Sequence, residues 1–116
     1  MRQEEHRLQC ACVRWFRCQY PRLAPFLFAV PNGGARSRTT GALLKAEGVL
    51  AGVADIICIP PSASGPVLFI EMKTDKGRLS DAQKQFRDAM TAAGHIYVIC
   101  RSIDDFINSI NAFLIP

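Results

Sequence analysis

The order of apolar and polar residues predicts helices and strands along the whole chain. Residues 3–18 carry one apolar stripe at helical spacing, formed by Leu8, Cys12, Trp15 and Phe16. Three more helices are predicted, over about 40–47, 80–93 and 102–114. Ser80 and Gln83 have the spacing of a capping box, which places the start of the third helix.

Runs of β-branched and other apolar residues predict four strands, at 26–30, 53–59, 67–73 and 95–100. Seven loop residues centred on Ala63 join the second and third strands, so the numbers of facing residues in this hairpin should sum to 126. In that register Asp55 lies opposite Glu71, with their Cβ atoms roughly 4.5–5.5 Å apart. A shift of two residues keeps both on one face of the sheet, whereas a shift of one does not.

The helix between the third and fourth strands makes those two strands a parallel pair. The order of elements therefore predicts an α/β fold with one mixed sheet flanked by helices. A length of 116 residues is that of one domain, here 1–116. No apolar run is long enough to span a bilayer, and the first residues do not have the pattern of a signal peptide. We expect no membrane association and a cytoplasmic location.

Charge and cysteine content narrow the possible functions. Residues 1–48 contain eight Lys or Arg against three acids, a net charge of +5, while the remainder has six against seven, a net of −1. This asymmetry favours a polyanionic partner for the first half of the chain. The five cysteines are an odd number without a C-x-x-C pair, which argues against a disulfide framework and against a zinc site.

The facing carboxylates of Asp55 and Glu71 are the main candidate for chemistry. Two carboxylates this close destabilise the fold unless a proton or a cation lies between them. Lys73, two residues after Glu71, could neutralise only one of them, and Mg²⁺ would suit the pair better. The alternative is a structural set of ion pairs at the edge of the sheet. Glu5 lies in the middle of the apolar stripe of the first helix, although a glutamate there could also serve the helix dipole.

Six blocks of sequence, in this order and spacing, resemble the VRR-NUC (virus-type replication-repair nuclease) branch of the PD-(D/E)XK nuclease superfamily. They cover nearly the entire chain: "EHRLQ" (5–9), "VPNGG" (30–34), "LLKAEGVLAGVADI" (43–56), "LFIEMK" (68–73), "GRLSDAQ" (77–83) and "AAGHIYVI" (92–99). The chain has Ala54 where the family usually has proline before the aspartate. The resemblance implies a restriction-endonuclease-like core.

The resemblance also implies roles for individual residues. Asp55, Glu71 and the main-chain carbonyl of Met72 would hold Mg²⁺, with Mn²⁺ able to substitute, and Glu5 would reach the metal from the helix. Lys73 would be catalytic. Gln83 matches a glutamine of the family, although its capping role could explain its presence without catalysis.

The expected function is a metal-dependent endodeoxyribonuclease that acts on branched DNA, of Holliday-junction or flap type. Its setting would be replication, repair or recombination in a bacterial or phage-infected cell. The alternative is a nucleic-acid-binding module with the same fold that does not cut. Phosphate contacts are expected from one loop and the helix after it: Asn32, Gly33, Gly34, Arg36, Arg38 and Lys45.

A homodimer is also expected, because one small domain offers one site whereas a branched substrate can have two-fold symmetry. A group of aromatic residues lies close together in the sequence, and the core of one small domain need not bury all of them. It comprises Trp15, Phe16, Tyr20, Phe26 and Phe28. The alternative is that these aromatic residues simply pack under the sheet.

Overall fold

The computed structural model describes residues 2–31, 38–62 and 64–115. Within these ranges one mixed sheet has the strand order β1-β2-β3-β4. The strands are β1 (Leu27–Ala29), β2 (Ile56–Cys58), β3 (Leu68–Met72) and β4 (Ile96–Cys100). The helices are α1 (Arg2–Gln19), the 3-10 helix η1 (Pro21–Phe26), α2 (Arg38–Ala46), α3 (Asp81–Ala92) and α4 (Ile103–Leu114).

The pairing of the strands confirms the predicted hairpin and crossover. Strands β2 and β3 are antiparallel with Ile57 opposite Phe69, so facing numbers sum to 126 as predicted. Strands β3 and β4 are parallel, joined through α3, and β1 is antiparallel to β2 at the edge of the sheet. The predicted fold class, a mixed sheet flanked by helices, is confirmed.

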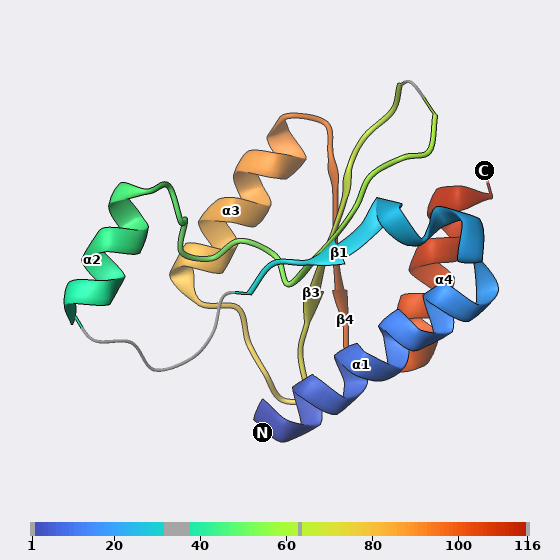
Figure 1. The fold of residues 1–116 in the computed structure, drawn as a ribbon, viewed down its shortest axis with the longest axis horizontal. Helices are drawn as coiled ribbons and strands as arrows, with labels where there is room; N and C mark the ends of the chain where they lie inside the picture. Colours follow the sequence, from blue (N-terminus) through green and yellow to red (C-terminus); the bar gives the residue numbers. More distant parts are fainter. Residues whose placement is uncertain (1, 32–37, 63, 116) are drawn as a thin grey trace.

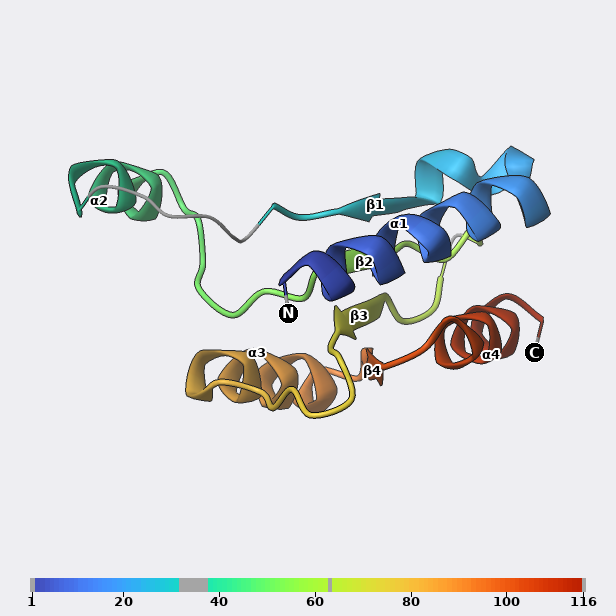
Figure 2. The same ribbon diagram turned by 90° about the horizontal axis from the view of Figure 1, so that it is seen from below.

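Helices cover both faces of the sheet (Figures 1 and 2). Helices α1 and α4 lie together on one face, and the larger core packs between them and the strands, with Phe16, Ile70 and Phe106 completely buried. Helix α3 covers the other face over a smaller core that includes Phe69 and Phe86. Helix α2 extends away from the sheet, beyond α3 (Figure 1). In the described part of the chain, no helix is long and apolar enough to cross a membrane.

The first predicted strand is shorter than expected, because a turn of 3-10 helix precedes it. Pro21 and Pro25 both lie within η1, where their fixed φ suits a tight helical turn. The extended segment therefore starts at Leu27 rather than at Phe26. The predicted strand at 53–59 likewise begins late, at Ile56, although the backbone of Asp55 still accepts a hydrogen bond from Val30 N at 2.8 Å.

Most of the aromatic residues near the first helix pack inside the molecule. Phe16 is fully buried, and Trp15 lies edge-on to both Tyr20 and Phe106. The Tyr20 hydroxyl donates a hydrogen bond of 2.6 Å to Asn111 Oδ1, which joins the end of α1 to α4. Phe28, 45% exposed, is the exception. The aromatic concentration therefore serves mainly the packing of α1 against α4, and it gives little support to an interface.

Candidate active site

Glu71 is a carboxylate inside the sheet. It lies on β3, whose five residues are all buried, and only 2% of Glu71 is exposed. Its Oε2 accepts a hydrogen bond from Gln83 Nε2 at 3.0 Å and lies 3.8 Å from Lys73 Nζ. Its Oε1 is buried and has no hydrogen-bond partner among the described residues. A buried carboxylate oxygen without a partner is costly, so the Glu71 carboxyl group is stable here only with a proton or a cation beside it.

Asp55 approaches the same position from the neighbouring chain segment. It immediately precedes β2, where the register of the hairpin continues to place it opposite Glu71. Asp55 Oδ2 accepts a hydrogen bond of 2.7 Å from the backbone N–H of Met72. The Asp55 carboxylate is thereby held against the end of β3, beside the residue whose main-chain carbonyl was predicted as a metal ligand.

The electrostatics of Glu71 show that the site lacks positive charge. Burial first, and the neighbouring Asp55 carboxylate second, raise the pKa of Glu71 from 4.5 to about 8, while Lys73 acts in the opposite direction. The single ammonium group, 13% exposed, does not offset the other two effects. At neutral pH the Glu71 carboxyl group therefore retains a proton unless a cation takes its place. Lys73 alone therefore leaves the Asp55–Glu71 pair with more negative than positive charge when both carboxylates are ionised.

Gln83 acts both as a helix cap and as a partner of Glu71. Its backbone N–H donates to Ser80 Oγ at 3.2 Å, and its Oε1 accepts from Ser80 N at 2.8 Å, which completes the predicted capping box. Its Nε2 is left free to donate to Glu71. The two interpretations of this glutamine from sequence are therefore compatible, because the two ends of its amide group face different partners.

Gly52 holds the segment that leads to Asp55 against the start of α3. Its φ is +87°, and a Cβ placed on it would lie 2.4 Å from the carbonyl carbon and oxygen of Ala82 and 2.8 Å from the backbone N of Gln83. Only glycine permits so close an approach at this φ. The backbone contact thus ties the Asp55 segment to the helical turn that carries Gln83.

Glu5 lies on α1, half-buried, across a groove from the other carboxylates. The groove has a volume of about 1030 Å³ and is lined by Glu5, Asp55 and Met72 at one end. The charge of Glu5 also raises the pKa of Glu71, although less than Asp55 does. Within 2–31, 38–62 and 64–115, no three His, Cys, Asp or Glu side chains already form a metal-binding cluster. A cation here would depend on two carboxylates, a main-chain oxygen and water, which is a ligand set that Mg²⁺ accepts.

The predicted phosphate-binding residues are only partly described. Asn32, Gly33, Gly34 and Arg36 lie outside the described residues, and for Arg38 only the backbone, at the start of α2, is described. Lys45 is exposed near the end of α2. The structure therefore leaves the phosphate contacts of this segment as predictions.

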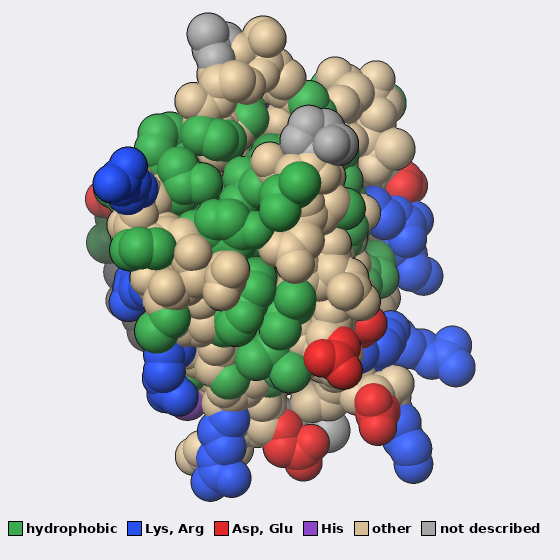
Figure 3. Space-filling model, turned by 90° about the vertical axis from the view of Figure 1, so that its right-hand side faces the viewer, with side chains coloured by type: hydrophobic (Ala, Val, Ile, Leu, Met, Phe, Trp, Pro, Cys, Tyr) green, Lys and Arg blue, Asp and Glu red, His purple; other side chains and the backbone are tan. Residues whose placement is uncertain are grey.

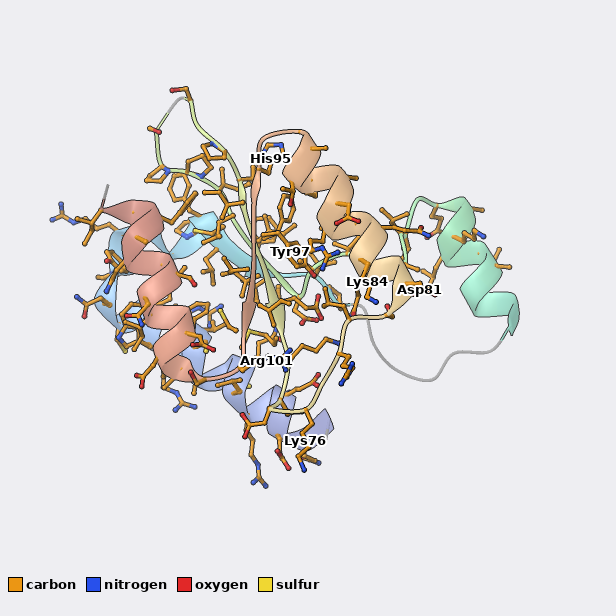
Figure 4. All side chains as sticks on the ribbon, turned by 180° about the vertical axis from the view of Figure 1, so that it is seen from behind. Lys76, Asp81, Lys84, His95, Tyr97 and Arg101 are labelled. Carbon is orange, nitrogen blue, oxygen red and sulfur yellow. The ribbon has the colours of Figure 1, made fainter. Side chains whose placement is uncertain are left out.

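Arg101 is a residue of this region that sequence reasoning missed. It directly follows β4, and its Nη1 donates to three backbone carbonyls of the loop that follows Lys73. These are the carbonyls of Thr74 at 2.7 Å, Gly77 at 2.8 Å and Asp75 at 3.2 Å. Figure 4 shows Arg101 at the end of the strand, beside the loop that carries Lys76. The hydrogen bonds join Arg101 to the backbone of a loop more than twenty residues earlier in the chain. No sequence motif indicates such a contact, because every residue type has a backbone carbonyl.

Two further residues with polar rings lie on the α3 side of the sheet (Figure 4). The hydroxyl of Tyr97 is buried and has no hydrogen-bond partner in the described structure. Burial and, next, the charge of Glu71 raise the pKa of Tyr97, so its hydroxyl keeps its proton. His95 Nδ1 accepts a hydrogen bond of 3.0 Å from Val67 N, which is a structural role at the start of β4.

Comparison with known proteins supports the assignment suggested by these features. The family model of the VRR-NUC domain matches residues 1–104. The chain belongs to the VRR-NUC family. A solved structure described as a VRR_NUC domain protein is similar to this chain with a TM-score of 0.78 and 25% sequence identity, over 94% of this chain and 86% of that chain. No curated protein matches the sequence significantly. The resemblance drawn from the six sequence blocks is thus confirmed, and the chain is a nuclease-type domain.

The double role of Gln83 in this VRR-NUC domain can be separated by substitution. Gln83→Ala and Ser80→Ala should each lower stability by about 1 kcal/mol, because each removes part of the capping box. Gln83→Ala alone should also lower nuclease activity, by about tenfold or more, since it frees the Glu71 carboxylate from its orienting partner. Thermal unfolding and initial cleavage rates measure the two effects. Equal losses of activity in the two variants would show that Gln83 acts only as a helix cap.

Proposed function

We propose that this protein is a divalent-metal-dependent endodeoxyribonuclease. The observation that carries the proposal is the unpartnered, buried Oε1 of Glu71 beside the Asp55 carboxylate. One oxygen of the two carboxylates has no hydrogen-bond partner among the described residues, and the single ammonium group of Lys73 cannot balance two negative charges. Such a site suits a hard cation.

The residues that would hold Mg²⁺, or Mn²⁺ in its place, are Asp55, Glu71 and the Met72 main-chain carbonyl, with Glu5 reaching from α1 across the groove. When bound, the cation would neutralise the carboxylates and polarise the scissile phosphate. Gln83 donates to Oε2 of Glu71, so Oε1 is the oxygen that would be available to the cation. The donor set consists of oxygen atoms only, which favours Mg²⁺ over metals that prefer sulfur or nitrogen.

Lys73 is the residue that we propose acts on the phosphate itself. Its ammonium group lies 3.8 Å from Glu71 Oε2, and its backbone N–H is fixed by a hydrogen bond of 3.1 Å to the Cys100 carbonyl. From this position the ammonium group can hold the attacking water and stabilise the negative charge that develops on the phosphate oxygens. The phosphodiester bond is broken as the water oxygen bonds to phosphorus. The water loses a proton to solvent, and the leaving oxygen gains one from solvent.

The site residues form the basis for a direct test by cleavage. Asp55→Asn, Glu71→Gln and Lys73→Ala should each abolish cleavage of labelled junction, flap, nicked and linear DNA in Mg²⁺ or Mn²⁺, and EDTA should abolish it in the unsubstituted protein. Lys73→Ala should retain most of the metal binding seen by calorimetry, because it removes no ligand. A suitable control is Asp104→Asn, an exposed carboxylate in the first turn of α4 on the other face of the sheet.

A different pattern would favour the second candidate, a module that binds nucleic acid without cutting it. That pattern is retention of DNA without metal, together with no cleavage of any substrate in the panel. Near-normal cleavage by one of the three variants would instead remove that residue from the site.

We propose branched DNA, of Holliday-junction or flap type, as the preferred substrate, in phage or bacterial replication, repair or recombination. We also propose that the protein acts as a homodimer, because a two-fold protein presents two sites to a two-fold junction. The surface supports this assembly: apolar side chains gather on the face formed by η1 and α4 (Figure 3). Ile115, 64% exposed, directly follows α4.

Light scattering tests the dimer independently of activity. The expected mass in dilute buffer is twice the 12.8 kDa of one chain. A mass equal to one chain at micromolar protein concentrations would rule out the homodimer, and it would leave the proposed chemistry of the site unaffected.

A further inference from the structure

The groove that contains Glu5 and Asp55 continues along α1, well beyond the carboxylates. Helix α1 forms one wall, and Val30 and Pro31, which follow β1, contribute to the lining opposite it. The lining side chains of α1 extend over most of the length of the helix, from Gln3 to Cys18. Arg14 and Arg17 are not among the residues that the sequence predicts as phosphate contacts.

The charges in this groove are divided between its two ends. The acids Glu5 and Asp55 lie at the end near the start of α1, whereas Arg14 and Arg17 lie toward the end of the helix. Both arginines are exposed, and neither forms an ion pair with an acid in the part of the chain that the structure describes. The groove therefore has an acidic end suited to a cation and a basic end whose charge is available to a polyanion.

The spacing of these residues along α1 gives the basic end a defined distance from the acidic one. Arg14 and Arg17 follow Glu5 by nine and twelve residues. At a rise of about 1.5 Å per residue, the arginine backbones lie about 13 and 18 Å further along the helix axis. Both arginines therefore lie on the same side of the acidic end along the axis of α1.

We propose that the α1 groove holds the DNA strand that is cut, with Arg14 and Arg17 bound to phosphates on one side of the scissile bond. The position of the scissile bond rests on the proposed function, whereas the two phosphate contacts rest on the groove itself. Because the contacts are made to the backbone, they position the strand without reading its sequence.

The test is a binding measurement that requires neither metal nor cleavage. Affinity for labelled DNA is measured by fluorescence anisotropy in EDTA over a range of salt concentrations. Arg14→Ala/Arg17→Ala should reduce the slope of log affinity against log salt by about two, one for each lost contact. Arg14→Lys/Arg17→Lys should keep the slope, because the charges remain.

A control variant that loses the same charge distinguishes specific phosphate contacts from a general effect of net charge on DNA binding. Arg7→Ala/Arg22→Ala removes two exposed arginines, one on α1 and one on η1, neither of which lines the groove. This variant should keep a slope close to that of the unsubstituted protein. Equal slopes in the two double-alanine variants would overturn the proposal, and thermal unfolding shows that both remain folded.

A length series then locates the contacts relative to the cut. On DNA shortened from one side, the cleavage difference between the unsubstituted protein and Arg14→Ala/Arg17→Ala should vanish once the DNA no longer reaches beyond the scissile bond on that side. A difference that persists on both sides of the cut would contradict the contacts assigned to the groove. If the protein binds DNA in the groove but never cuts, the proposed function fails while the groove assignment stands.

Discussion

The structure depends on a carboxylate that its own chain does not neutralise. Glu71 lies within a fully buried strand, faces Asp55 across a hairpin, and keeps one oxygen without a partner among the described residues. Burying a carboxylate in this way is destabilising unless it is protonated or paired with positive charge. This cost is the reason why we propose that the Asp55–Glu71 pair binds a cation.

The elements around Glu71 hold the remaining groups in fixed positions. The hairpin register brings Asp55 to the end of β3, and the Gly52 backbone rests on the first turn of α3. That turn provides Gln83, whose amide orients one oxygen of Glu71. Arg101 binds the backbone of the loop after Lys73. The segment before β2, strand β3 and the first turn of α3 thus meet at one pair of carboxylates.

The parts of this arrangement that follow from local rules could be predicted from the sequence. The length of the loop around Ala63 determined the register, and the Ser80–Gln83 spacing determined the start of α3. The hydrogen bonds of Arg101 could not be predicted, and neither could the groove along α1, because both depend on how distant segments pack. The 3-10 helix at Pro21–Phe26 was missed because its prolines were taken to end one helix rather than to begin another. The groove matters most, since it is the surface that we propose for DNA next to the predicted metal site.

The central claim is that the Asp55–Glu71 pair is built to receive a cation, and thermal unfolding against pH, with and without Mg²⁺, tests it most directly. The pKa of Glu71 is raised in the folded protein, to about 8 from 4.5, so the folded state binds the proton more tightly than the unfolded state. Without metal, stability should therefore be greatest below about pH 5 and should fall as the pH rises toward 8. Mg²⁺ should restore stability increasingly over the same range, because it binds the ionised pair in the folded state only. In Glu71→Gln both the fall with pH and the Mg²⁺ effect should be largely lost. Two results together would contradict the account. The unfolding midpoint at pH 8 would not change with millimolar Mg²⁺, and the unsubstituted protein would be no less stable at that pH than Glu71→Gln.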